Sequence, residues 1–222
     1  MTSILDAATS ATIAEAAMKY IDAGCSIIPL DGKKPASSIK NWTVFARQQP
    51  PRGLVAHWLR SGIMRAGIGL IGGAVSGGLV LLDVDSMAAC AEFEATFPNL
   101  VDTLTVRSGS GRGKHYYFYA HRLPGNAYRG GVELRCTGAY VVAPPSIHPV
   151  SGQPYRVECQ SDVRRVYGMA SVRKWILERG GGAMAVTPKP ARIDSGIRDA
   201  TAYGRKALLD QAAIVAAARE GV

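Results

Sequence analysis

The segment LLDVDS at 81–86 is an apolar strand that ends in two aspartates separated by one residue. Side chains alternate between the two faces of a strand, so we expect Asp83 and Asp85 to share one face while Val84 points to the other. Two neighbouring carboxylates repel each other unless a cation lies between them, and hard oxygen ligands favour Mg²⁺ or Mn²⁺. The segment therefore predicts a metal site at the end of a buried strand. For this pair alone, solvated carboxylates at a strand end are the simpler interpretation.

A glycine-rich segment, RSGSGRGKHYYFY at 107–119, follows downstream. Glycine lets backbone N–H groups converge on an anion, and Lys114 with His115 adds positive charge, so we interpret the segment as a triphosphate-binding loop. Its expected ligands are Ser110, Gly111, Gly113, Lys114 and His115. It is not a Walker A loop, because that motif needs Ser or Thr where His115 stands and a helix after it, whereas YYFY favours a strand. A glycine-rich hairpin turn is the alternative.

A third acidic residue occurs in GVELRCTGAYVVAPPS at 131–146. In a strand that begins here, Glu133 and Arg135 share a face, as expected of a metal ligand beside a phosphate-binding guanidinium. An ion pair on the surface of a sheet is the alternative. The apolar strand that follows must end at Pro144 and Pro145, which cannot donate to a strand ladder.

Taken in order, these segments resemble the bifunctional primase/polymerase (prim-pol) domain of the archaeo-eukaryotic primase superfamily, common in phages, prophages and plasmids. The resemblance covers roughly residues 12–157 and includes GCSIIPL at 24–30, GKKP at 32–35 and Trp42. It implies an α+β fold: an archaeo-eukaryotic primase catalytic core with a mixed or antiparallel, RRM-like sheet flanked by helices, followed by a short helical C-terminal tail.

The resemblance also implies template-dependent nucleotidyl transfer, in which primers are synthesised de novo on single-stranded DNA and extended during replication of a mobile element. It makes Asp83, Asp85 and Glu133 the ligands of two Mg²⁺ or Mn²⁺ ions, and His115 a contact to the phosphates of the incoming nucleotide. Arg135 is a further candidate for phosphate binding. The implied partners are a single-stranded DNA template, nucleoside triphosphates, and a helicase domain in the same protein or in trans. No zinc is expected, because the stretch 116–132 contains no cysteine.

Two other classes of function would use similar residues. A metal-dependent nuclease needs the acids but no triphosphate-binding loop. A non-catalytic DNA-binding replication module would bind DNA even after its acids were removed. A glycosyltransferase also uses D-x-D with Mn²⁺, but the downstream motifs favour nucleotidyl transfer.

Composition agrees with a polyanionic partner, because the net charge is +9. Template phosphates could contact Lys33, Lys34, Arg164, Arg165, Arg173 and Lys174, although solvated surface charge is the alternative role for each. The four cysteines, at 25, 90, 136 and 159, lack metal-binding spacing, which indicates structural thiols. No apolar stretch is long enough to span a membrane, so we expect no membrane partner and a cytoplasmic location, that of the host if a phage encodes the protein.

The periodicity of apolar residues predicts strands interleaved with few helices. The first helix begins near Thr12, which has Glu15 at capping-box spacing, and ends at Gly24. Further helices are expected near 52–61, 87–96 and 162–178, and strands at 25–30, 67–71, 78–85, 103–107, 115–120, 131–135, 139–143 and 154–158. The literal G-x-G-x-x-G at 67–72 leads into a turn and a strand, so it does not indicate dinucleotide binding.

The expected domain organisation has three parts. Residues 1–180 form the catalytic domain, 181–197 a linker rich in Gly and Pro, and 198–222 the start of a helical C-terminal segment that we expect to be truncated.

Overall fold

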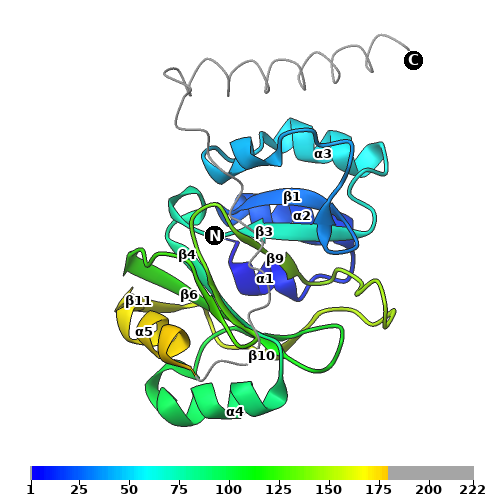
Figure 1. The fold of residues 1–222 in the computed structure, drawn as a ribbon. Helices are drawn as coiled ribbons and strands as arrows, with labels where there is room; N and C mark the ends of the chain where they lie inside the picture. Colours follow the sequence, from blue (N-terminus) through cyan, green and yellow to red (C-terminus); the bar gives the residue numbers. More distant parts are fainter. Residues whose placement is uncertain (1, 180–222) are drawn as a thin grey trace, which may run out of the picture.

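Two β-sheets form the framework of the protein in the computed structural model, which describes residues 2–179 (Figure 1). The smaller sheet contains β1 (Ser26–Asp31), β2 (Lys34–Pro35), β3 (Gly67–Ile71) and β9 (Tyr140–Ala143). The larger sheet contains β4 (Leu79–Val84), β5 (Thr105–Arg107), β6 (Lys114–Arg122), β7 (Ala127–Arg129), β8 (Val132–Arg135), β10 (Arg156–Cys159) and β11 (Arg164–Gly168). The strand orders are β2-β1-β3-β9 and β10-β5-β6-β4-β8-β7, with β11 paired to β6.

Five α-helices in the described part pack against these sheets or against one another. They are α1 (Ile4–Ala8), α2 (Ile13–Asp22), α3 (Arg52–Arg60), α4 (Met87–Thr96) and α5 (Ala170–Glu178), with 3₁₀ turns η1 (Trp42–Ala46), η2 (Ala74–Ser76) and η3 (Pro98–Leu100). In Figure 1, α3 lies above β1, and α4 lies below the larger sheet. As predicted, the hydroxyl of Thr12 caps α2 by accepting a hydrogen bond from the Glu15 amide at 3.2 Å. Over residues 2–179, every helix is too short or too polar to cross a membrane.

The central strand β4 is buried on both faces. Leu79 and Leu81 belong to a hydrophobic cluster shared with the smaller sheet, whereas Val80, Leu82 and Val84 belong to a second cluster shared with α4 and α5. This division follows from the alternation of side chains along a strand. A carboxylate in β4 is therefore surrounded by apolar structure, and its position is fixed by the packing on either side.

The expected α+β fold is confirmed, and the eight expected strands agree closely with β1, β3, β4, β5, β6, β8, β9 and β10. All the strand pairs are antiparallel except β6 with β11, which are parallel. The larger sheet is therefore mixed. The predicted linker at 181–197 and the helical tail at 198–222 lie outside the described residues.

The helix predicted at 162–178 is wrong in its first part, because residues 164–168 form β11 and the helix starts only at Ala170. The strand β5 covers β6 only between Lys114 and Tyr116, so the rest of that edge is free to bind another strand. The β11 segment fills it, pairing with β6 from Phe118 onwards. A long-range pairing of this kind overrides local helical propensity.

The turn into β6 predicts a large difference between two glycine variants. A Cβ at Gly113 would collide with the carbonyl oxygen of Val84 and approach Asp85, whereas Gly53 on α3 has open space around it. Gly113→Ala should lower the free energy of unfolding by about 2 kcal/mol or more, because overpacking at backbone contacts is costly. Gly53→Ala should raise it by about 0.5–1 kcal/mol, because alanine favours a helix. Urea unfolding of both variants tests this, and equal effects would contradict the packing described for the turn.

Candidate active site

The register of β4 brings three predicted site residues together. Asp83 is directly opposite His115 on β6 and directly opposite Glu133 on β8. Directly opposed residues share a face of the sheet, so the three side chains lie side by side. The Nε2 atom of His115 is 3.3 Å from Oδ1 of Asp83. Asp85, just after the end of β4, lines the same pocket.

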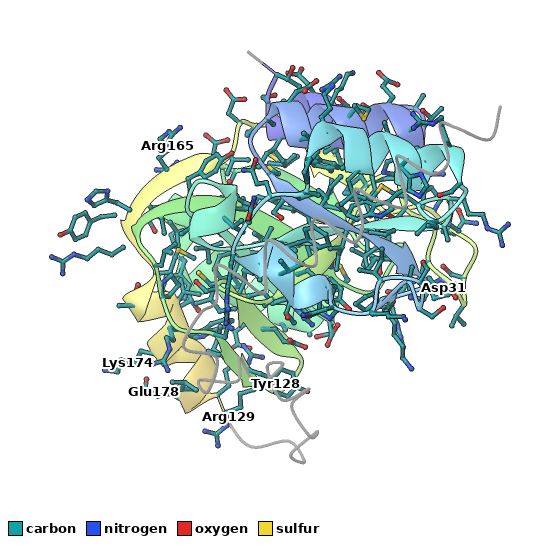
Figure 2. The ribbon with its side chains drawn as sticks, turned by 90° about the horizontal axis from the view of Figure 1, so that it is seen from above. Asp31, Tyr128, Arg129, Arg165, Lys174 and Glu178 are labelled. Atoms are coloured by element: carbon teal, nitrogen blue, oxygen red, sulfur yellow. The ribbon has the colours of Figure 1, made fainter. Side chains whose placement is uncertain are left out.

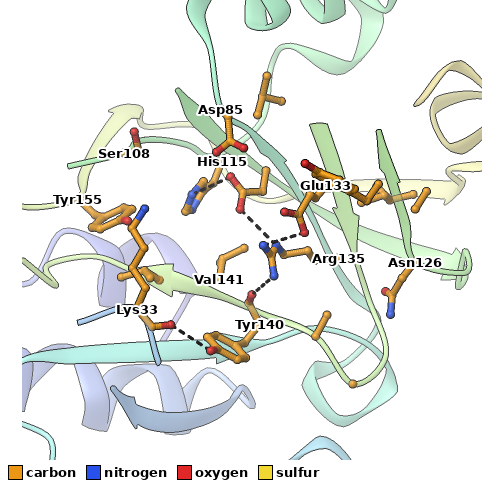
Figure 3. Close-up of a pocket in the computed structure, with 18 of the residues that line it drawn as sticks. Lys33, Asp85, Ser108, His115, Asn126, Glu133, Arg135, Tyr140, Val141 and Tyr155 are labelled. Carbon is orange, nitrogen blue, oxygen red and sulfur yellow. Dashed lines mark hydrogen bonds and ion pairs between the residues drawn. The ribbon is translucent and has the colours of Figure 1, made fainter. Parts of the chain in front are cut away.

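Arg135 connects the acids to the smaller sheet. Its Nε lies 3.2 Å from Oδ2 of Asp83, and its Nη2 lies 2.8 Å from Oε2 of Glu133. Its Nη1 donates a hydrogen bond to the carbonyl oxygen of Tyr140 on β9 at 3.2 Å. Figure 3 shows the guanidinium directed at Glu133 and at the Tyr140 carbonyl. The predicted sharing of a face by Glu133 and Arg135 is thus observed, as an ion pair that lines a pocket.

The three carboxylates differ in how well their charge is balanced. Burial alone would raise the pKa of Asp83, but His115 and Arg135 outweigh this effect and hold the pKa at about 2. The pKa of Asp85 is raised, mainly by burial and to a smaller extent by repulsion from Asp83. Burial also raises the pKa of Glu133, although Arg135 acts in the opposite direction. The negative charge of Asp85 and Glu133 is therefore incompletely compensated by the cations nearby.

The donor set fits a hard divalent cation in its chemistry. Carboxylate oxygens are the ligands that Mg²⁺ and Mn²⁺ prefer, and the raised pKa values of Asp85 and Glu133 indicate a site that would gain from added positive charge. No ready-made group of three ligating side chains occurs within residues 2–179. Instead, the guanidinium of Arg135 bridges Asp83 and Glu133, so a cation would compete with Arg135 for these two acids.

The glycine-rich loop is a hairpin turn between β5 and β6, in which Arg107 is opposite Lys114. Its amides mostly bond within the loop. The Gly111 amide donates to the Ser108 carbonyl at 2.8 Å, and the Gly113 amide donates to the Ser108 hydroxyl at 3.3 Å. The side chains of Ser108 and Ser110 line the pocket instead. Their hydroxyl oxygens lie 2.9 Å apart and share a hydrogen bond. The loop therefore faces the pocket with a bonded hydroxyl pair, and the amides of Gly111 and Gly113 also have partners.

Lys114 lies apart from the other predicted triphosphate ligands. It is opposite Val84, so it shares the face of the sheet that packs against α4. Its ammonium forms ion pairs of 2.9 Å with both Glu94 and Glu158, and its side chain is only 11% exposed. Strand alternation sends Lys114 and His115 to opposite faces, so Lys114 lies outside the pocket in this structure, and its predicted role in binding triphosphate stays a prediction.

Several pocket residues have no predicted role in the active site. The pocket has a volume of about 830 Å³, within the usual range for small-molecule sites, and its lining includes Lys33, Trp42, Asn126, Tyr128, Tyr140 and Tyr155. The Tyr155 ring lies 5.5 Å from the His115 ring, centroid to centroid. Trp42 packs edge-on against Tyr140 at 5.2 Å. The sequence signal for Trp42 was its place in the family resemblance, and no local pattern assigned a role to Tyr155.

A second cation, Lys33, faces the acids from the turn between β1 and β2. Its positive charge favours the ionised form of both Asp83 and Asp85, but it is a smaller influence than burial. The pKa of Asp85 is therefore still raised overall. The Tyr140 hydroxyl donates to the Lys33 carbonyl at 3.0 Å, which ties this turn to β9. Figure 3 shows the Lys33 side chain extending towards Tyr155. Among the residues predicted to contact template phosphates, Lys33 and Lys34 line the pocket, whereas Arg164 and Arg165 are on β11 and Arg173 and Lys174 on α5.

A family model described as "Bifunctional DNA primase/polymerase, N-terminal" matches residues 17–171. This range includes β4, the glycine-rich loop and β8. A search of curated proteins finds no match.

The unequal charge balance predicts opposite effects of two conservative variants on the metal-free protein. The folded pKa of Asp83 lies below its ordinary value of 3.8, so its stabilising contribution is complete above that value and is lost as the pH falls towards 2. At neutral pH, Asp83→Asn should therefore lower the free energy of unfolding by on the order of 2 kcal/mol. The folded pKa of Asp85 is raised, so its ionisation opposes folding as the pH rises through that pKa, and Asp85→Asn should increase stability.

Urea unfolding in the presence of a chelator provides the measurement. Loss of stability in both variants to the same extent would contradict the described charge balance.

Proposed function

Because the matched range covers most of the chain, the protein belongs to the bifunctional DNA primase/polymerase family, and we propose that it both starts primers on single-stranded DNA and extends them with nucleoside triphosphates during replication of a mobile element. The observation that carries this proposal is the register of β4, which places Asp83 between His115 and Glu133 in a pocket that also contains Arg135 and Lys33. Acids and cations in one pocket suit a reaction that needs metal ions and a triphosphate at the same place.

Asp83, Asp85 and Glu133 are the proposed metal ligands. Bound Mg²⁺ or Mn²⁺ ions would supply positive charge that activates the attacking 3′-hydroxyl and neutralises the departing pyrophosphate. The protein contributes the position of the acids, which is fixed by β4 and β8.

Three cationic or polar groups are proposed to hold the triphosphate. Arg135 offers a planar guanidinium suited to phosphate oxygens, and Lys33 adds a flexible ammonium from the opposite wall. His115 has a buried Nδ1 atom without a hydrogen-bond partner within residues 2–179, while its Nε2 faces Asp83. A buried polar atom of this kind is costly unless a ligand satisfies it, which supports a direct contact to substrate. Ser108 and Ser110 share a hydrogen bond, which leaves one of their two O–H groups to donate to the substrate.

The end of the pocket lined by Trp42 and Tyr140 is the proposed place for the nucleoside part of the substrate. Aromatic rings offer apolar surface for a base or sugar, and this end adjoins the cations because Tyr140 bonds to both Lys33 and Arg135. One substrate could then span the pocket, with its triphosphate at the acids and its base at the aromatic pair.

A primer-extension assay tests the proposal. The wild-type protein with Mg²⁺ or Mn²⁺ should extend a labelled primer on a single-stranded template, and Asp83→Asn should reduce extension by at least about 100-fold, since metal coordination supplies several kcal/mol. Asp22→Asn is the matched control, because Asp22 is on α2 and pairs with Arg52. Degradation of the labelled DNA without incorporation would instead identify a nuclease, and unchanged extension by Asp83→Asn would contradict the metal assignment.

Priming is tested separately on an unprimed single-stranded template with labelled nucleotides. Products of the wild-type protein that disappear in Asp83→Asn are expected. Extension of a supplied primer with no products on the unprimed template would remove de novo synthesis from the proposal.

The proposed role of His115 gives a further prediction. His115→Ala should raise the KM for the nucleotide by on the order of tenfold while it changes the affinity for template DNA by much less, because the proposed contact is to the triphosphate. Steady-state kinetics and DNA-binding measurements on the same preparation provide the comparison. Equal losses of both affinities would assign His115 a structural role.

A further inference from the structure

An exposed aromatic and basic surface lies at the end of β6 farthest from the candidate active site. It consists of His121 and Arg122 on β6 and Arg165 and Tyr167 on β11, and we call these four residues the β11 ridge. All four are exposed, and Tyr167 retains 65% of its surface. Figure 2 shows Arg165 at the outer edge of the molecule. A large aromatic side chain that is this accessible on an edge strand offers a flat apolar surface to a partner.

The ridge is organised by stacking. The Tyr167 and His121 rings lie 5.8 Å apart between centroids at 33°, and the Arg122 guanidinium is 5.1 Å from the Tyr167 centroid. The Arg165 guanidinium lies 5.0 Å from the ring of Tyr119, its direct neighbour on β6. These contacts hold a ring and two guanidinium groups in place while leaving them exposed, so a ligand would meet a partly ordered surface.

The charge of the ridge is available to a partner. Within residues 2–179, neither Arg122 nor Arg165 forms an ion pair, whereas Arg107, Arg135 and Arg179 each pair with a carboxylate. The neighbouring Arg164 is also exposed and forms no ion pair in the same range. Two arginines beside an accessible tyrosine favour a ligand that carries both negative charge and flat apolar groups.

We propose that the β11 ridge binds a segment of single-stranded DNA outside the active site. Bases would stack on Tyr167, and phosphates would contact Arg122 and Arg165. Stacking platforms combined with positive charge are the general means by which proteins bind single strands without sequence preference. The choice of DNA as the ligand rests on the proposed function. The description of the ridge as an exposed, aromatic and basic surface does not depend on that function.

The ridge and the pocket lie towards opposite ends of β6. Side chains at every second position of β6 share a face, so His121 is on the same face of the larger sheet as His115. The two residues are six residue steps apart along the strand, which corresponds to about 20 Å. A strand bound to the ridge would therefore leave the pocket free.

A different role for the same arginines is protection of an edge strand. Charged side chains on an exposed edge hinder pairing between copies of a protein. This role requires charge but no accessible aromatic ring, and it predicts self-association on removal of the arginines without a change in affinity for DNA. The two roles therefore differ in their measurable consequences.

Fluorescence anisotropy with a labelled oligothymidylate of about 20 nucleotides tests the proposal, in chelator and without nucleotide. Tyr167→Ala should weaken binding on the order of fivefold or more, the range for loss of one stacked base, and Tyr167→Phe should retain most of the affinity. The double variant Arg122→Ala/Arg165→Ala should reduce the slope of log affinity against log salt by about 1.4, about 0.7 for each lost phosphate contact. Arg60→Ala/Arg65→Ala removes the same charge from exposed positions elsewhere and is the matched control.

Urea unfolding and size-exclusion chromatography confirm that each variant is folded and monomeric. Unchanged affinity and salt slope in folded ridge variants, or losses equal to those of the control, would overturn the proposal, as would self-association with unchanged DNA binding. Equal competition by oligouridylate would support the ridge as a general single-strand site, because RNA shares the relevant groups. The measurement involves neither metal nor nucleotide, so its result is independent of the polymerase assay.

Discussion

The pairing of β4 with β6 on one side and β8 on the other is the constraint on which the candidate site depends. Asp83 has only one direct neighbour on each strand, and these neighbours are His115 and Glu133. A slip of one residue in either pair would send the partner side chain to the opposite face, into the cluster packed against α4 and α5. The register is protected because both faces of β4 are packed, so a slip would place a charged side chain in an apolar cluster.

Charge balance explains why one buried carboxylate is tolerated and its neighbours remain reactive. Arg135 and His115 compensate Asp83, whereas Asp85 and Glu133 keep raised pKa values. Because Arg135 balances part of the negative charge of the three acids, the protein can fold without metal. The remaining negative charge would still be stabilised by a bound cation. The same guanidinium lies beside the proposed triphosphate position, so the arrangement of Arg135 links the metal and nucleotide halves of the pocket.

Local patterns predict the strands of the site well but not the partners of each side chain. The two aspartates at the end of an apolar run and the alternation of Glu133 with Arg135 gave the acidic face correctly, because a period of two follows from backbone geometry alone. Lys114 and His115 were predicted to bind the triphosphate together, but the same alternation places them on opposite faces of the sheet. The strand β11 was missed because its existence depends on the short reach of β5 along β6, which no local pattern encodes. The part of the pocket lined by Trp42 and Tyr140 likewise depends on how the two sheets pack.

Binding of Mn²⁺ to the protein, followed by electron paramagnetic resonance, tests the central claim most directly, because it reports on the acids without requiring catalysis. The account predicts that the wild-type protein reduces the signal of free Mn²⁺, more so with a nucleoside triphosphate present, and that Glu133→Gln and Asp83→Asn each abolish most of this binding. Glu158→Gln, which alters a carboxylate on the opposite face beside Lys114, should leave it unchanged. Equal Mn²⁺ binding by the wild type and by Glu133→Gln and Asp83→Asn would contradict the account.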